Sequence, residues 1–378
     1  MIPKEKKIIP FRPGHRNRRA VTVFLGGVVM VLLLLAFFLV DGGQNWDSLM
    51  RLAVYGKEPL RIEQGTANQC VQWNGRLVTA GSSGVICYTR DGDMDFIAAA
   101  ELSSPELIAG KDTLLIHDAG GNQLLLLDEK GNRLLEQRIK GTIYDAHMSA
   151  DGAVAYLSSG DREKTVLQVF DREQLLCFSL YSDTRYLSRC AVSSGGAYVC
   201  AVALTEENGE FCSVAVIYDT DREEPLAEVS VGNQMIYDVQ FLDKDTICLV
   251  GDSSLCILNT AGESLVRYAY DALLEYTLNG EGYCALAVGD ESGYYLMTMG
   301  GSGKLLGRLP LTGMDIQLAA GGKYLAWVTD GMLYMSTASL NPGQGRPTGA
   351  VTSGLCVAAP GVCYIVDSRG ATRYLFER

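Results

Sequence analysis

From about residue 57 to the end of the sequence, apolar and polar residues alternate with a period of two in short runs. The runs are rich in Val, Ile, Tyr, Leu and Cys, and clusters of Gly, Asp, Asn and Ser separate them. This alternation is typical of half-buried β-strands, and the clusters are typical of the turns between strands. Because no long segment of this region has the helical period, the sequence predicts an all-β fold for residues 57–378.

The strand pattern recurs eight times, each time as a turn followed by an apolar strand. The mean spacing is about 41 residues, the length of a four-stranded β-propeller blade. A β-sandwich would explain the strands but not their regular spacing. We therefore predict an eight-bladed β-propeller, with a seven-bladed ring as the alternative. The repeats lie at residues 74–93, 111–132, 151–171, 195–219, 244–264, 281–303, 321–339 and 360–377.

The last repeat is short and supplies only about three strands. The segment Leu60–Glu63 precedes the first complete repeat and alternates apolar with charged residues, as a half-exposed outer strand does. An open ring would leave the apolar faces of two blades in water, at on the order of 1.5–3 kcal/mol for each exposed side chain. We therefore predict that Leu60–Glu63 forms the outer strand of the last blade and closes the ring.

A different pattern precedes the strands, because residues 20–40 form a run of 21 residues without a charge. As a helix, this run would reach roughly 30 Å, the thickness of the hydrocarbon core of a bilayer. A cleaved signal peptide is the alternative, but its apolar core is shorter, about 7–15 residues, and ends at a small-residue cleavage site. We therefore expect one transmembrane helix over residues 20–40.

The charges on either side of this run predict its orientation. Residues 1–19 carry seven Lys and Arg residues against the single acid Glu5. Positively charged flanks stay on the cytoplasmic side of a membrane. We therefore expect a basic cytoplasmic tail at 1–19, a juxtamembrane connector with a short helix at 41–56, and an extracytoplasmic propeller at 57–378.

Charge bears on the class of partner, and cysteine content bears on the presence of disulfides. The net charge of −12 at pH 7 becomes more negative when the basic tail is set aside, so no nucleic-acid partner is expected. The 11 cysteines are an odd number and cannot all pair with one another. Most lie in apolar strand-like runs, so we expect them to be buried free thiols. Cross-strand disulfides remain open for Cys248 with Cys256 and for Cys200 with Cys212.

These features together resemble a known family. The basic tail, the single apolar span, the connector Asn-Trp-Asp-Ser-Leu-Met-Arg-Leu at residues 45–52 and the propeller repeats are similar to a group of Gram-positive envelope proteins. That group is defined only as a domain of unknown function, and the resemblance implies a single-pass membrane protein. The repeats also resemble WD40-like and quinoprotein-like propellers, but no repeat ends in Trp-Asp. The chain has only three Trp residues, so the resemblance implies no quinone cofactor.

Asp91, Asp93 and Asp95 lie in one turn with the spacing Asp-x-Asp-x-Asp, which can direct three carboxylates at a calcium ion. The twelve-residue calcium loop also needs Gly at its sixth position and Glu at its twelfth, where this sequence has Phe96 and Leu102. A solvated Asp-Gly hairpin is the preferred interpretation. No cofactor is expected, and Ca²⁺ is kept as the metal alternative.

Charged residues recur near the start of the expected innermost strand of successive repeats. Propellers often bind ligands where these strands open into the central funnel. The competing interpretation is a set of turn and solvent-lining charges. The candidate ligand-binding residues are Asp145, Arg185, Arg189, Asp238, Glu275 and Asp315.

The sequence contains no pattern that points to a reaction. His117 and His147 are the two histidines of the strand region, and no Gly-x-Ser-x-Gly elbow accompanies them. We therefore expect no catalytic residues and predict a membrane-anchored binding or scaffolding module at the cell envelope. Its expected partner is a protein or an envelope component. The alternative is an enzyme or a cofactor-carrying propeller with its site in the central funnel.

Overall fold

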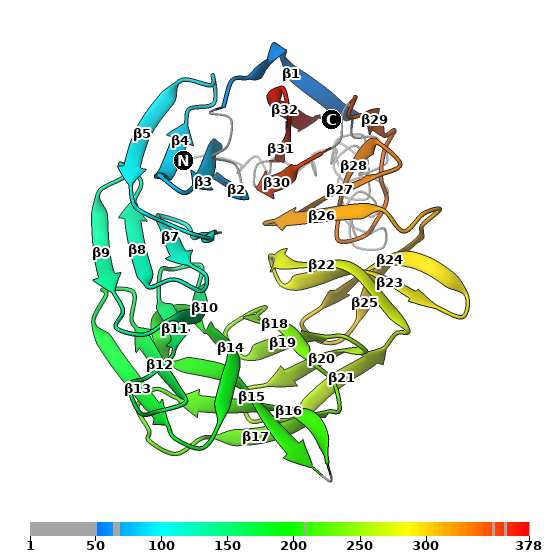
Figure 1. Cartoon of the computed structure of the whole chain (residues 1–378). Coiled ribbons are helices and arrows are strands. Elements are labelled where there is room, and N and C mark those ends of the chain that lie inside the picture. Colours follow the sequence, from blue (N-terminus) through cyan, green and yellow to red (C-terminus); the bar gives the residue numbers. More distant parts are fainter. Residues whose placement is uncertain (1–50, 63–68, 208, 350–351, 359–360, 378) are drawn as a thin grey trace, which may run out of the picture. The chain divides into compact units, whose positions relative to one another are not determined.

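The computed structural model of the protein describes residues 51–62, 69–207, 209–349, 352–358 and 361–377. These residues form eight antiparallel sheets of four strands each, arranged around a ring (Figure 1). The repeats predicted from the sequence fall on the hairpins formed by the second and third strands of the blades. The eight-bladed propeller is therefore confirmed, and the seven-bladed alternative is wrong.

Each of the first four blades consists of four consecutive strands. From the inner strand outward they are β2 (Gln69–Trp73), β3 (Arg76–Gly81), β4 (Gly84–Tyr88) and β5 (Met94–Ala99); β6 (Pro105–Ala109), β7 (Thr113–Asp118), β8 (Gln123–Asp128) and β9 (Arg133–Arg138); β10 (Ile143–Met148), β11 (Val154–Ser158), β12 (Thr165–Phe170) and β13 (Leu176–Ser182); β14 (Tyr186–Val192), β15 (Tyr198–Glu207), β16 (Glu210–Asp219) and β17 (Ala227–Gly232). A 3₁₀ turn, η2 (Ser194–Gly196), follows β14.

The remaining blades follow the same plan, except that the eighth takes its outer strand from the start of the described chain. From the inner strand outward they are β18 (Ile236–Phe241), β19 (Thr246–Gly251), β20 (Ser254–Asn259) and β21 (Ser264–Ala269); β22 (Ala272–Gly280), β23 (Tyr283–Asp290), β24 (Gly293–Gly300) and β25 (Leu305–Pro310); β26 (Ile316–Gly321), β27 (Tyr324–Thr329), β28 (Met332–Thr337) and β29 (Arg346–Pro347); β30 (Gly354–Ala358), β31 (Val362–Asp367), β32 (Gly370–Glu377) and β1 (Arg51–Leu60).

The position of a strand within its blade explains its residue pattern. Middle strands are covered on both faces by the adjoining blades, and all six residues of β19 are buried. Outer strands have one face in water, so β9 and β21 alternate exposed with half-buried residues. The near-continuous apolar runs and the alternating runs seen in the sequence are thus the middle and outer strands of the same blades.

Among the described residues the hydrophobic core is divided into eight layers, one between each pair of neighbouring blades. One layer joins blades 3 and 4, with Leu167 and Val199 buried in it. Another joins blade 8 to blade 1, with Tyr364 and Leu77 buried in it. Since each layer needs side chains from two blades, no blade can bury its own faces alone.

The ring is closed by strand β1, which pairs antiparallel with β32 (Figure 1). The register places Val54 opposite Tyr374 and Leu60 opposite Ala371. The predicted closure of the last blade by the segment ahead of the first repeat is therefore confirmed, but the strand lies earlier than predicted. It ends at Leu60, where the predicted strand Leu60–Glu63 begins, because β32 offers its pairing positions to Arg51–Tyr55.

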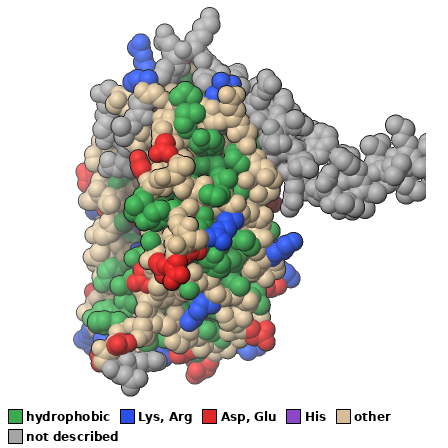
Figure 2. All heavy atoms as spheres, turned by 90° about the vertical axis from the view of Figure 1, so that its right-hand side faces the viewer, with side chains coloured by type: hydrophobic (Ala, Val, Ile, Leu, Met, Phe, Trp, Pro, Cys, Tyr) green, Lys and Arg blue, Asp and Glu red, His purple; other side chains and the backbone are tan. Residues whose placement is uncertain are grey.

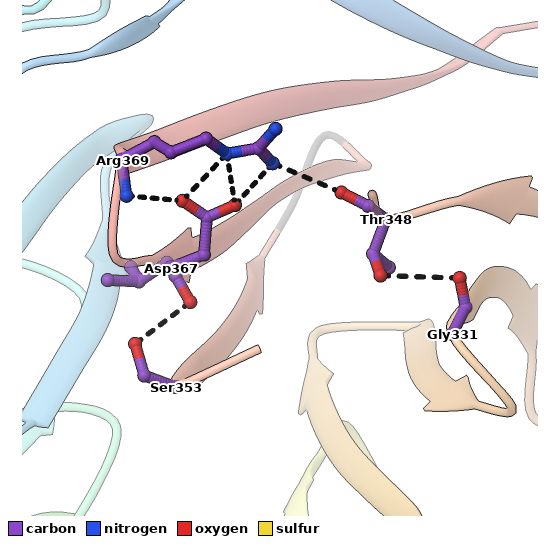
Figure 3. Close-up of polar contacts among 6 residues, drawn as sticks. Gly331, Thr348, Ser353, Asp367 and Arg369 are labelled. Atoms are coloured by element: carbon purple, nitrogen blue, oxygen red, sulfur yellow. Dashed lines mark hydrogen bonds and ion pairs between the residues drawn. The ribbon is translucent and has the colours of Figure 1, made fainter. Parts of the chain in front are cut away.

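A polar contact ties blade 8 to blade 7 on the side of the β31–β32 turn (Figure 3). The Asp367 side chain is 1% exposed and accepts four hydrogen bonds from Arg369. They come from Nη2 at 2.6 Å, from the backbone N–H at 2.7 Å and from Nε at 3.1 and 3.3 Å. These bonds lower the pKa of Asp367 below its ordinary value. Arg369 Nη2 also donates to the carbonyl oxygen of Thr348 at 3.3 Å, and Thr348 Oγ1 donates to Gly331 O at 3.2 Å.

The expected fold class needs a correction at its N-terminal end. Within the ranges that the structure describes, no helix is long and apolar enough to cross a membrane. The fold class is therefore corrected to an eight-bladed β-propeller, and the preceding transmembrane helix is dropped from it. Residues 1–50, including the expected tail and span, lie outside the described residues. The expected short helix at 41–56 overlaps β1, whose residues 51–56 are extended.

All 11 cysteines lie within the described residues and are free thiols. Nine are buried, as expected, while Cys70 is half-buried and Cys177 is exposed. The cross-strand disulfides considered from the sequence are wrong. Cys248 lies opposite Ile257 and not opposite Cys256. Cys200 lies opposite Ile217, while Cys212 lies opposite Thr205.

The outer side of the ring mixes apolar and charged side chains. Figure 2 shows hydrophobic side chains between Lys, Arg, Asp and Glu on the side of the molecule that faces right in Figure 1. Large apolar side chains exposed in blade 6 and in the connection to blade 7 include Leu305 and Met314. Scattered exposure of this kind is ordinary for a protein surface.

Candidate functional site

Charged residues from five adjacent blades approach one another on the inner strands of the ring. Each is partly exposed. The charges of Asp145, Arg189 and Glu106 are close enough to Asp238 to change its pKa. The charges of Asp238, Arg189 and Asp145, and that of the neighbouring Glu275, act in the same way on Tyr276. We call this group the inner-strand cluster. It comprises Glu106 on β6, Asp145 on β10, Arg189 on β14, Asp238 on β18 and Glu275 on β22.

A β-bulge precedes the charged residue in four of these five strands. In β10 the pairing runs from Ile143 opposite Ser158 to Asp145 opposite Leu157, which leaves Tyr144 as the extra residue. The registers of β14, β18 and β22 shift at the corresponding place. Bulges redirect the next side chain and are frequent beside functional sites. The same backbone device therefore directs Asp145, Arg189, Asp238 and Glu275 in four successive blades.

Backbone N–H groups hold three of the carboxylates in place. Asp145 Oδ2 accepts from the N–H of Cys190 on the next blade at 2.7 Å. Asp238 Oδ1 accepts from the N–H of Val239 at 2.8 Å, and a Glu275 oxygen accepts from the N–H that follows it at 3.0 Å. Each carboxylate thus uses one oxygen to satisfy a backbone group near a bulge.

Arg189 connects two bulges. Its Nε donates to the carbonyl oxygen of Tyr237, the bulge residue of blade 5, at 2.6 Å. Its Nη1 donates to the carbonyl oxygen of Ser188, the bulge residue of its own blade, at 2.8 Å. The guanidinium is therefore fixed between blades 4 and 5 by carbonyl groups, and its charge lies within reach of the surrounding carboxylates.

Glu106 and His117 extend the cluster to blade 2, and the sequence interpretation missed both roles. They lie directly opposite each other on β6 and β7, and His117 Nε2 is 3.2 Å from a Glu106 carboxylate oxygen. The contact with His117 lowers the pKa of Glu106. The His117 side chain is 1% exposed, and its Nδ1 has no hydrogen-bond partner among the described residues. The repeats were aligned on their hairpins. An alignment of the repeats on their inner strands would have placed Glu106 and Asp145 at neighbouring positions of successive blades.

His147 has a structural role. Its Nδ1 accepts a hydrogen bond from the N–H of Val192 on the neighbouring blade at 3.2 Å. Burial lowers the pKa of His147 to about 4, so the ring is neutral at physiological pH. The His147 side chain therefore links blade 3 to the backbone of blade 4.

Burial dominates the acidity of the cluster. It raises the pKa of Asp145 to about 6 and that of Asp238 to about 7, and for Asp238 the neighbouring charge of Asp145 adds to the effect. Burial also raises the pKa of Glu275. Asp145 and Asp238 therefore become negatively charged in a pH range where most surface carboxylates are already ionised, and an approaching cation stabilises the charged form of each.

Two predicted site residues lie apart from the cluster. Arg185, just ahead of β14, makes a two-point ion pair with Glu228 on the outer strand of its blade, at 2.8 and 2.9 Å. Asp315 is exposed immediately before β26. Four of the six predicted residues thus come together: Asp145, Arg189, Asp238 and Glu275.

The predicted calcium ligands do not gather. Asp91 and Asp93 are exposed in the β4–β5 turn, and Asp95 forms an ion pair with Arg76 at 2.7 Å. Within the described ranges, no three His, Cys, Asp or Glu side chains lie close enough to hold a metal ion. The arrangement gives the calcium hypothesis no support.

A shallow polar hollow of about 620 Å³ lies among the loops of blades 1 to 3. Asp118, 4% exposed, organises its floor by accepting the N–H groups of Ser103 and Ser104 at 2.7 Å each. Arg138 and Lys140 on its wall are opposed by Glu101. The hollow is open and carries both charges, so its chemistry selects no ligand class.

Fold and cluster together define the class of this protein: an eight-bladed β-propeller, a fold that commonly serves as a binding or scaffold module. A family model described as a family of unknown function (DUF5711) matches residues 56–338. The match spans most of the chain, and the chain belongs to this family. No curated protein matches the sequence.

Solved propellers share the fold at low sequence identity. The C-terminal WD40 domain of Sif2 has a TM-score of 0.56 and 11% identity, over 86% of this chain and 98% of that chain. The β-propeller domain of Cps50 (Swd1) from Myceliophteria thermophila has a TM-score of 0.50 and 11% identity, over 86% of this chain and 99% of that chain. The WD40-like resemblance is thus confirmed for the fold, and identity this low supports nothing beyond it.

Proposed function

We propose that the propeller is a binding module and that its inner-strand cluster receives a positively charged Lys or Arg side chain of a protein partner. One observation carries the proposal: the inner strands of five adjacent blades carry four carboxylates and a single guanidinium. Glu106, Asp145, Asp238 and Glu275 together exceed the charge of Arg189, so the cluster has an excess of negative charge once they ionise.

The state of the carboxylates supports a cationic ligand. Burial and mutual repulsion keep Asp145 and Asp238 partly protonated near neutral pH, and an incoming ammonium or guanidinium group relieves both effects. Hydrogen bonds to Cys190 N–H and Val239 N–H fix each carboxylate before a ligand arrives. Such preorganisation reduces the entropy lost on binding.

The sign of the pH dependence follows from these groups. Below the pKa values of about 6 and about 7, Asp145 and Asp238 are neutral and attract a cation weakly. Above those values both are charged. The affinity for a basic peptide should therefore increase as the pH rises from about 5 to about 8.

A pentalysine peptide is a suitable probe, with binding measured by titration calorimetry at low and fixed salt. The triple variant Asp145→Asn, Asp238→Asn, Glu275→Gln should bind it at least about tenfold more weakly than the unmodified chain. It should also lose most of the pH dependence. Amide side chains keep an oxygen acceptor for the backbone N–H groups, so the fold should survive.

The matched control removes the same number of charges elsewhere. Asp91, Asp93 and Glu291 are exposed in turns of blades 1 and 6. The variant Asp91→Asn, Asp93→Asn, Glu291→Gln has the same net charge as the cluster variant. If both triple variants weaken peptide binding equally, attraction to the overall acidic surface explains the binding and the proposed site is wrong.

A further inference from the structure

Two cysteines meet at the seam where the ring closes. Cys70 lies on β2, the inner strand of blade 1, and Cys356 lies on β30, the inner strand of blade 8. The chain between them passes through every blade of the ring. Cys356 and Cys70 both pack into the apolar layer that joins blade 8 to blade 1.

The contact between the two side chains is direct. Their thiols are hydrogen-bonded to each other. The Cys70 sulfur also lies 2.9 Å from the position that a Cβ atom would take at Gly354, two residues before Cys356 on the same side of β30. A larger residue than glycine at position 354 would therefore push the Cys70 sulfur away from its partner.

The two thiols differ in access and in acidity. Cys70 is half-buried, whereas Cys356 is only 6% exposed. The hydrogen bond from Cys356 lowers the pKa of Cys70, and the same hydrogen bond together with burial raises the pKa of Cys356. Cys70 is thus the more accessible and the more acidic of the two thiols, and the thiolate is the reactive species in thiol–disulfide exchange.

We propose that Cys70 and Cys356 are a modification site, at which a small-molecule disulfide converts the two thiols into a disulfide bond that locks the ring. The Cys70 thiolate attacks one sulfur of the reagent and releases the other half as a thiolate. The Cys356 thiol then loses its proton and attacks the Cys70 sulfur of the mixed disulfide. The second half of the reagent leaves, so two protein thiols are oxidised and one reagent disulfide is reduced to two thiols.

The lock would act at one particular seam of the ring. Blades 1 and 8 share one apolar layer, and β1 completes blade 8 through backbone pairing with β32. A covalent bond between the inner strands would restrict the unfolded chain over nearly its whole described length. Cross-links that close long loops give large stabilisation.

The test uses the full chain, purified with a reductant, freed of it and then exposed to oxidised glutathione. Peptide mapping by mass spectrometry without reduction should identify one cross-linked pair containing Cys70 and Cys356, with a mass lower by two hydrogens. The melting temperature should rise on oxidation and return to its starting value when dithiothreitol is added. The variants Cys70→Ala and Cys356→Ala should each abolish both the cross-linked peptide and the rise.

A second pair of neighbouring thiols provides the matched control. Cys248 and Cys284 are also hydrogen-bonded to each other between adjacent blades, but both are fully buried. Cys284→Ala should leave the cross-link and the oxidation-induced rise unchanged. Glutathione retained on Cys70 without loss of the Cys356 thiol would overturn the proposal. A cross-linked peptide containing any other pair of cysteines would do the same.

Discussion

At the scale of single residues, the half-buried carboxyls Asp145 and Asp238 of the inner-strand cluster reduce the stability of the fold when they ionise. A carboxyl with a higher pKa in the folded protein contributes stability that is fully present below its unfolded pKa, about 4. That contribution is lost as the pH rises through the folded pKa. For Asp238 the folded pKa is about 7, so the loss extends from acidic pH to neutral pH.

The variant Asp238→Asn should therefore stabilise the protein at about pH 8 and leave its stability unchanged at about pH 4. Asparagine carries no charge to desolvate and can still accept the N–H of Val239. We expect the melting temperature at the higher pH to rise by a few degrees, measured by differential scanning calorimetry across the pH range.

The exposed Asp252 provides the control, because Asp252→Asn removes a charge that is already in water. It should change the melting temperature little at either pH. A gain for Asp238→Asn that is equally large at low and high pH would show that the change acts through packing and that the carboxylate charge is not its cause.

Individual site residues differed in how far the sequence could predict them. Asp145 and Asp238 stand out because each ends the same tripeptide, Ile-Tyr-Asp, at the start of an inner strand. Glu106 follows a proline and has no such pattern, and its partner His117 reaches it only through pairing of neighbouring strands. The bulges were not predictable, since they depend on which backbone groups pair and not on residue type.

At the scale of elements, strand β1 depends on pairing with a strand that is very distant from it in the sequence. Its partner β32 ends the last blade, and without β1 one edge of β32 would present unpaired N–H and C=O groups. Strand position was predicted incorrectly because residues 51–56 lack alternation and Pro59 suggested a strand start. The register is set by β32, which the local pattern does not reveal.

Two truncations that differ only in β1 test its role. A chain starting at Arg51 should melt as a closed ring, whereas a chain starting at Arg61 should melt about 10 °C lower, because blade 8 loses its outer strand. Thermal unfolding followed by circular dichroism measures the difference. Adding the peptide Arg51–Leu60 to the shorter chain should restore part of the loss, and equal melting temperatures for the two chains would refute the assignment.

At the scale of the whole molecule, the eight apolar layers make every blade depend on both neighbours. Repeat spacing predicted this architecture, because a regular period requires units that cover one another. The enzymatic alternative stays an untested prediction, since the fold hosts many functions. Buried cysteines report on the layers directly: Cys190, Cys87, Cys200 and Cys363 each lie in a different one.

We expect these thiols to become reactive together as denaturant is added to the reduced protein. Pulse labelling with iodoacetamide, followed by mass spectrometry of each cysteine peptide, gives one transition midpoint for each of these four layers. Native protein should label mainly at Cys177, which is exposed, and at Cys70, which is half-buried. Coincident midpoints indicate one cooperative ring. Midpoints that differ between layers would mean that blades open separately.

The shared eighth blade also imposes an order on biosynthesis. Strand β1 precedes every other strand of the ring during translation, and its partner β32 is made after all the other blades. For that whole interval the first blade has an uncovered face and β1 has no sheet to join. Contacts between such distant segments form slowly, and unpaired strands can associate with other chains in the meantime. Nascent protein of this kind is the form most dependent on chaperones.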